Sequence, residues 1–284
     1  MQAARRKVLT MLQDRRLDVQ QAEEMLDALE PGSQPVRPPH PVPDIVGDSP
    51  WNREFRQTLE KIAATHAPVL ILGERGTGKA LIARIIHYHS RRADGPFTAL
   101  NCANAEEVIM DELFGREDGP HSKKGALDQA HGGTLLLDTI VALPDAVQQR
   151  LHAFLQDGYF TRVNGTRRHH ADVRLMGASN HDFVQLIDQG RFRADLYYRL
   201  SVCLVQSAPL RQRREDIPLL TEHFLTAQAA RQQRQAPTLD PAVADLLQQH
   251  HWPGNVAQLS DVITQAIERC DGPQITPDHL PELN

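Results

Sequence analysis

The 284-residue sequence has few cysteines and no long apolar run. Its three cysteines, Cys102, Cys203 and Cys270, are odd in number and far apart, which argues against a disulfide framework and is typical of a protein in a reducing cytosol. No apolar stretch reaches the ~18–20 residues that a membrane-spanning helix needs. The first residues are also too polar for a secretory signal. These absences predict a cytoplasmic protein.

Neither sign of charge dominates the sequence. There are 31 Lys and Arg residues against 36 Asp and Glu residues, a formal net charge of −5, which gives no general attraction to nucleic acid or an anionic membrane. A local basic group is formed by Arg162, Arg167, Arg168, His169 and His170. Because no basic stripe extends it, we interpret this group as solvated loop charge and expect no direct contact with DNA.

The first 43 residues are distinct from the rest. Apolar residues recur at helical spacing in two short segments, one around Val8 to Leu12 and one from Ala22 to Leu29. We therefore expect a helical hairpin over residues 1–30, an interaction or oligomerisation module. Residues 31–43 contain six prolines, which predicts a stiff, extended linker.

From residue 44 the pattern is α/β. Apolar strands are predicted at 69–72, 97–100, 134–137 and 173–178, with helical segments between them, so we expect a parallel sheet in a three-layer α/β/α domain over 44–208. After Pro209 we expect no more strands. Helices predicted over 214–232, 240–250 and 255–270 indicate a small helical lid domain over 209–284.

A glycine-rich turn follows the first strand. Gly73-Glu-Arg-Gly-Thr-Gly-Lys79 stands between a strand and a helix, the arrangement of a P-loop, in which backbone amides surround phosphates and the lysine reaches the outer ones. The next residue usually carries a hydroxyl that contacts Mg²⁺, but here it is Ala80. Asp138, at the end of the strand 134–137, is the candidate metal ligand, helped by water.

These residues and several other ordered motifs resemble one family. They are Ile45-Val-Gly-Asp-Ser-Pro50, Asn101-Cys-Ala103, Glu112-Leu-Phe-Gly115, Gly132-Gly-Thr-Leu-Leu-Leu-Asp138, Phe192-Arg-Ala-Asp-Leu-Tyr-Tyr-Arg-Leu200, Pro209-Leu-Arg-Gln-Arg-Arg-Glu-Asp-Ile217 and Trp252-Pro-Gly-Asn-Val256. From about residue 45 to 281 the chain is similar to the AAA+ domain of the bacterial enhancer-binding proteins, the sigma-54-dependent transcriptional activators.

The resemblance implies a ring-forming ATPase that binds ATP and Mg²⁺. It places ATP on Ile45, Val46, Gly73, Glu74, Arg75, Gly76, Thr77, Gly78, Lys79, Ala80, Leu81 and Asp138. It makes Asp138 the Mg²⁺ ligand, Asn180 the sensor after the fourth strand, and Asn101 the switch asparagine. Arg193 and Arg199 would be arginine fingers, which stabilise charge at a neighbouring subunit's nucleotide.

The sequence departs from the family at positions that carry chemistry. Thr139 occupies the place of the water-activating glutamate, and threonine is no general base at neutral pH. Asn101 therefore lacks the carboxylate that it normally engages, and Ala257 stands where the family has a lid arginine. Residues 116–124 replace the longer Gly-Ala-Phe-Thr-Gly-Ala loop that contacts sigma-54. The sequence ends shortly after the lid, so the family's terminal helix-turn-helix is not expected.

Three functions fit these observations. The favoured one is an ATP-binding regulator of transcription of the sigma-54-activator type, impaired in hydrolysis, which acts through protein partners such as a sigma factor or a paralogous activator. A second is an active ATPase that remodels a partner with another base, for which Asp128 and Asp145 are candidates. A third is an ATP-dependent oligomeric scaffold, or a hetero-ring subunit that supplies arginine fingers in trans. Lys123 and Lys124 are expected to form a solvated loop tip.

Overall fold

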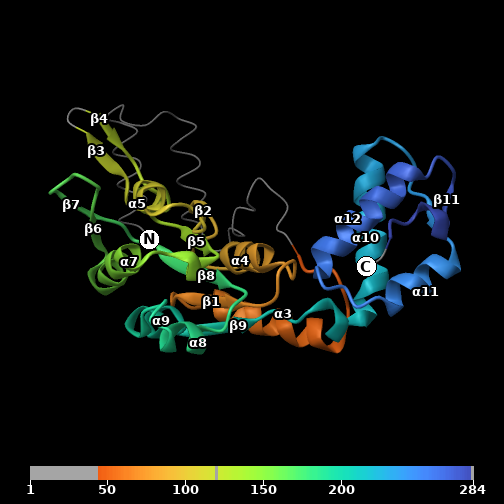
Figure 1. Ribbon diagram of the computed structural model, residues 1–284, viewed down its shortest axis with the longest axis horizontal. Helices are drawn as coiled ribbons and strands as arrows, with labels where there is room; N and C mark the ends of the chain where they lie inside the picture. Colours follow the sequence, from red (N-terminus) through yellow and green to blue (C-terminus); the bar gives the residue numbers. More distant parts are fainter. Residues whose placement is uncertain (1–43, 119–120, 283–284) are drawn as a thin grey trace, which may run out of the picture. The chain divides into compact units, whose positions relative to one another are not determined.

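The computed structural model describes residues 44–118 and 121–282 (Figure 1). The expected helical hairpin over 1–30 and linker over 31–43 lie outside the described residues. None of the helices described is both long and apolar enough to cross a membrane. The division into domains at residues 208 and 209 stays a prediction.

Five parallel strands form the central sheet, in the order β2-β5-β8-β1-β9. Their bounds are β1 Val69–Leu72, β2 Phe97–Asn101, β5 Thr134–Asp138, β8 Arg174–Ser179 and β9 Cys203–Gln206. The first four confirm the strands expected from the sequence to within one residue at each end. The sequence analysis missed β9, a short edge strand that pairs with β1. The Leu204 side chain of β9 stays half exposed.

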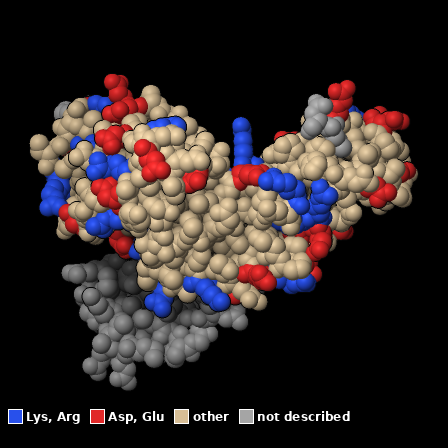
Figure 2. All heavy atoms as spheres, turned by 60° about the horizontal axis from the view of Figure 1, so that its bottom comes forward, with Lys and Arg blue, Asp and Glu red and all other residues tan. Residues whose placement is uncertain are grey.

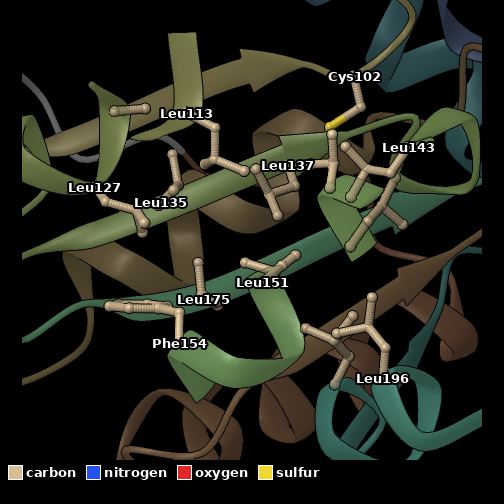
Figure 3. Packing of buried hydrophobic residues seen from close by; sticks show 14 of the residues in the cluster. Cys102, Leu113, Leu127, Leu135, Leu137, Leu143, Leu151, Phe154, Leu175 and Leu196 are labelled. Carbon is tan, nitrogen blue, oxygen red and sulfur yellow. The ribbon is translucent and has the colours of Figure 1, made fainter. Parts of the chain in front are cut away.

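Alternation along β5 divides the core between the two faces of the sheet. Leu135 and Leu137 belong to one buried cluster, and Leu136 belongs to the other. Helices α3 (Pro50–Ala63) and α4 (Lys79–Tyr88) supply apolar residues to the Leu136 face. Helices α5 (Glu106–Phe114), α7 (Asp145–Asp157) and α9 (Ala194–Leu200) supply the other face, part of which Figure 3 shows. The three-layer α/β/α core predicted from the sequence is therefore confirmed.

Two short antiparallel hairpins stand beside this sheet (Figure 1). One pairs β3 (Arg116–Asp118) with β4 (His121–Lys123), and the other pairs β6 (Tyr159–Thr161) with β7 (Arg168–His170). The remaining short elements are α6 Ala126–Gln129, α8 Phe183–Asp188, and the 3-10 helices η1 Ile140–Ala142, η2 Leu210–Gln212, η3 Arg214–Asp216 and η4 Pro277–His279.

The helical region after the sheet contains α10 (Ile217–Arg231), α11 (Pro241–Gln249) and α12 (Asn255–Arg269). These helices surround a separate apolar cluster that includes the fully buried Trp252, whose indole N–H donates to the Leu247 carbonyl. The expectation that strands stop after Pro209 is wrong. β10 (Thr238–Leu239) and β11 (Gln274–Ile275) form a parallel pair, too short to show a periodic pattern in the sequence.

Candidate nucleotide-binding site

The candidate site lies at the carboxyl ends of β1, β5 and β8, where parallel sheets usually bind ligands. The P-loop follows β1, Asp138 ends β5, and Asn180 follows β8. These segments enclose a polar cavity of about 530 Å³. Its lining consists of Arg75, Gly76, Gly78, Lys79, Ala80, Asp138, Thr139, Ser179, Asn180 and His181. We call it the phosphate cavity.

The P-loop has the backbone of an anion cradle. Gly76 and Gly78 have φ values of +78° and +92°, which strongly favour glycine. A Cβ on Gly76 would lie 2.1 Å from the Gly254 carbonyl oxygen, so no side chain fits there. Helix α4 begins at Lys79, so its N-terminal amides are next to the cavity.

Lys79 is held by the loop that it follows. Its ammonium donates to the carbonyl oxygens of Gly73 and Glu74, both at 2.9 Å. Burial lowers the pKa of Lys79, while the nearby Asp138 carboxylate opposes this shift. An incoming anion would further favour the charged ammonium.

A second, mostly apolar cavity of about 370 Å³ adjoins the first at Gly78. Ile45, Val46, Phe55, Leu81 and Val256 are among its lining residues. We call it the apolar cavity. Its lining comes from three parts of the chain: the residues before β1, the start of α4 and the helical region.

Arg213 gives the apolar cavity one buried cation. Its side chain is only 5% exposed, and its guanidinium carbon lies 4.8 Å from the centre of the Trp51 ring. Its Nε–H has no partner among the described residues, and burial lowers the pKa of Arg213. An apolar cavity with an unpaired donor, next to an anion cradle, fits a nucleotide. The base would lie in the apolar cavity and the phosphates on the P-loop.

The acidic end of β5 carries the Asp138 carboxylate, followed by Thr139. The Asp138 carboxylate accepts the Thr139 amide hydrogen at 2.9 Å. Thr139 has φ of +55°, a left-handed conformation that is strained for a β-branched residue. Among the described residues that line the phosphate cavity, Asp138 is the sole carboxylate. The cavity therefore offers a metal ligand but no second acid to activate water.

The two acids considered as substitute bases lie elsewhere. Asp128 accepts from the Gly125 amide at the start of α6 and pairs with Arg162 at 3.3 Å. Asp145 begins α7 and is exposed, 3.8 Å from Arg193. Neither lines the phosphate cavity. Proximity in sequence was a poor guide, because Asp128 belongs to α6 before the strand and Asp145 to α7 after η1.

His181 is a cavity residue that the sequence analysis missed. It follows Asn180 directly, and its amide donates to the Ser179 hydroxyl at 3.0 Å, which fixes the turn after β8. Its exposed imidazole lines the phosphate cavity together with Thr139. Its place immediately after the predicted sensor was the available signal.

Comparison with known proteins decides the family. Residues 45–206 match the model of the sigma-54 interaction domain, and residues 211–283 match an AAA+ ATPase lid domain. The chain belongs to the sigma-54 activator family.

Relatives agree with this assignment. The chain is 43% identical over 243 residues to the regulatory protein AtoC of Escherichia coli, which covers 84% of this chain and 53% of AtoC. It is 40% identical over 247 residues to the E. coli transcriptional regulator NtrC, covering 85% and 53%. It thus spans about half the length of these relatives.

Solved structures of NtrX from Brucella abortus are also similar. One has 40% identity and a TM-score of 0.79, covering 83% of this chain and 56% of NtrX. Another, of NtrX in complex with ATP, has 36% identity and a TM-score of 0.80, covering 96% and 59%. The P-loop AAA+ core with a helical lid is therefore shown by structure and by relatives together.

The lid of this family member rests directly on the P-loop. The Asn255 side chain donates to the Arg75 carbonyl at 2.9 Å and to the Glu74 carboxylate at 3.2 Å. Arg211 binds Glu74 through two nitrogens, at 2.8 and 2.5 Å. The hydrogen bonds from Arg211 and, to a smaller extent, from Asn255 lower the pKa of Glu74 to about 2. Ala257 donates its amide to the Gly76 carbonyl, so the lid gives the P-loop contacts but no cation to the phosphate cavity.

The predicted sensor and switch residues are placed differently. Asn180 lines the phosphate cavity. Asn101 pairs in register with Asp138, but its side-chain oxygen accepts the Ala103 amide at 3.0 Å and it does not line the cavity. The roles of both residues stay predictions.

The two predicted fingers lie at α9, Arg193 just before its first residue and Arg199 within it, and neither lines the chain's own phosphate cavity. Arg193 pairs with Asp195 at 2.8 Å, which raises the pKa of Arg193. Arg199 donates to the His152 ring at 3.2 Å and is exposed. A finger acts on another subunit's site, so this placement agrees with that role without testing it.

The β3–β4 and β6–β7 hairpins are joined by backbone and side-chain contacts. The Glu117 amide donates to the Val163 carbonyl at 2.9 Å, and Arg162 and His169 both approach the Glu117 carboxylate. The expectation of solvated charge is wrong for Arg162, which is 9% exposed. The hairpin pairing explains this, because it encloses Arg162 between Glu117 and Asp128.

Elsewhere charge is dispersed. Figure 2 shows basic and acidic side chains interspersed over one face, with uncharged surface between them. Lys123 and Lys124 are exposed and make no ion pair within the described ranges, in line with a solvated tip.

Proposed function

We propose that this protein is an ATP-binding regulator of transcription that acts through protein partners and hydrolyses ATP poorly. The base would occupy the apolar cavity, and the P-loop amides with Lys79 would hold the phosphates. Asp138 and water would hold Mg²⁺, a cation that prefers few carboxylates and several waters. The bound ion would supply charge neutralisation at the phosphates.

One observation supports the impaired hydrolysis: the position after Asp138 is Thr139, and the described residues that line the cavity include no further carboxylate. A positioned general base contributes ~10²–10⁴-fold to rate. Binding needs only the cradle, the lysine and the metal ligand, which are all present. The site therefore has the residues for binding ATP but lacks the residue expected to activate water for its hydrolysis.

Binding and turnover should be measured on the full chain with Mg²⁺. We expect the wild-type chain to bind ATP and the Lys79→Ala variant to lose this binding. We also expect the wild-type chain to turn over ATP no faster than Lys79→Ala does. Absence of ATP binding by the wild-type chain would refute the proposal. Omission of Mg²⁺ should weaken binding of ATP in the wild type and change little in Asp138→Asn.

His181 favours one alternative function, a slow ATPase with a different base. Its imidazole lines the same cavity as Thr139, and imidazole is a common general base near neutral pH. In that case turnover would be measurable and would fall ~10²-fold or more in His181→Gln, with ATP affinity unchanged. Equal turnover in both proteins would exclude it.

The resemblance to ring-forming activators extends the proposal to assembly. We propose that the chain forms a homo- or hetero-oligomeric ring in the cytoplasm and that Arg193 and Arg199 act at a neighbouring subunit. Their position supports this, since Arg193 lies just before α9, Arg199 lies exposed on it, and neither lines the chain's own phosphate cavity. Sedimentation with and without ATP, alone and with a competent activator, tests it. A monomer under all these conditions would contradict it.

A further inference from the structure

The described lining of the phosphate cavity includes one arginine and one lysine, Arg75 and Lys79. Two of the donors of Lys79 are already committed to P-loop carbonyls. The Arg75 side chain is exposed and makes no hydrogen bond or ion pair within residues 44–118 and 121–282. Arg75 is thus the cation with all its donors available to a ligand.

The backbone of Arg75 is fixed by the lid. Its carbonyl accepts from Asn255, a buried residue whose own side-chain oxygen accepts the Leu210 amide at 2.8 Å. On either side, Glu74 is bound by Arg211, and the Gly76 carbonyl accepts the Ala257 amide. The lid therefore fixes the point from which the Arg75 side chain extends, while the neighbouring lid cation Arg211 is bound to Glu74.

The position of Arg75 relative to the two cavities indicates which phosphate it would meet. The cavities share Gly78, so the base side of the site lies there. Arg75 lines the phosphate cavity and not the apolar cavity. Asp138, Thr139 and Asn180 line the phosphate cavity as well. Arg75 therefore belongs to the phosphate side of the site, where the last phosphoryl group of ATP would also be.

We propose, on the basis of the proposed function, that Arg75 is the residue that distinguishes ATP from ADP in this protein. The P-loop amides serve phosphates that both nucleotides possess, and two donors of Lys79 are already bound to P-loop carbonyls. The planar guanidinium can bind two oxygens of one phosphoryl group. Removal of Arg75 should thus weaken ATP binding and leave ADP binding nearly unchanged.

The experiment measures the affinities of ATP and ADP for the full chain with Mg²⁺. The variants are Arg75→Ala, Arg75→Lys and the control Arg167→Ala, an exposed arginine that lines neither cavity. We expect Arg75→Ala to weaken ATP ~10-fold or more and ADP less than about twofold, as for loss of a charged hydrogen bond. Arg75→Lys should keep part of the preference, because it retains the charge without the paired donors. Arg167→Ala should match the wild type.

Three results would overturn the inference: equal losses of ATP and ADP affinity, no loss of either, or the same change in Arg167→Ala. Each of these leaves the proposed function standing, provided that wild-type protein binds ATP. If the wild type binds neither nucleotide, the proposed function fails first. Thermal unfolding of each variant without nucleotide shows whether its fold is intact, and Arg75→Lys keeps the test decisive if Arg75→Ala unfolds.

Discussion

Two arginine–aspartate pairs on the β6–β7 hairpin differ in burial, and we predict that burial decides what they contribute. Arg162 is 9% exposed and pairs with Asp128, itself 16% exposed, at 3.3 Å. Arg168 pairs with Asp157 at the shorter distance of 2.7 Å, but these side chains are 64% and 51% exposed. Distance alone would rank Arg168 as the stronger pair.

Arg162→Ala should lower the free energy of unfolding by about 2–3 kcal/mol. Removing one member of a buried pair typically costs ~3–5 kcal/mol because the other charge is left uncompensated. The value should be lower here, since Asp128 and Glu117 retain some access to water. Arg168→Ala should cost less than about 1 kcal/mol, the usual limit for an exposed pair screened by solvent.

Urea unfolding of the two variants measures both values, and thermal unfolding should show a drop of about 4–10 °C for Arg162→Ala. Arg162→Met is a useful third variant, since it restores apolar packing without the charge. The reasoning is refuted if Arg168→Ala is as destabilising as Arg162→Ala, or if neither matters.

Three further predictions follow from the contacts of the lid. Arg211 and Asn255 lower the pKa of Glu74 from 4.5 to about 2. The contribution of the Glu74 carboxylate to the free energy of unfolding is therefore present above pH 4.5 and is lost as the pH falls towards 2. The difference in stability between wild type and Glu74→Gln, measured by urea unfolding, should shrink over that range. Asp216 is fully buried and accepts from the Ser49 amide and hydroxyl, so Asp216→Ala should cost ~2–3 kcal/mol in the same assay; a loss below about 0.5 kcal/mol would contradict this. Arg213→Met should weaken ATP binding ~10-fold by calorimetry, because it removes the buried cation from the lining of the apolar cavity; an unchanged affinity would contradict this.

Periodicity and the P-loop predicted most of the fold. The strands β1, β2, β5 and β8 each carry an apolar run bounded by turn residues, and α10 to α12 have clear starts. β10 and β11 have two residues each, too few for a pattern to emerge. β9 is as long as β1, but no P-loop follows it to mark the strand. They exist because β1 and the chain after the lid helices offer backbone partners, which depends on tertiary structure.

The site shows the same division. The P-loop and Asp138 were predictable because their spacing in the sequence sets their chemistry. Contacts between distant segments were not: Asn255 on Arg75, Arg213 over Trp51, and His181 beside Thr139 in the cavity. The burial of Arg162 was also missed, because it depends on the pairing of two hairpins about forty residues apart.

The most direct test of the central claim is ATP turnover, measured with ATP affinity on the same sample, for wild type and Thr139→Glu. We predict that both proteins bind ATP similarly, that the wild type shows negligible turnover, and that Thr139→Glu gains ~10²-fold or more by regaining a base. Rapid turnover by the wild type, unchanged or reduced in Thr139→Glu, would contradict the account and favour an ATPase with another base.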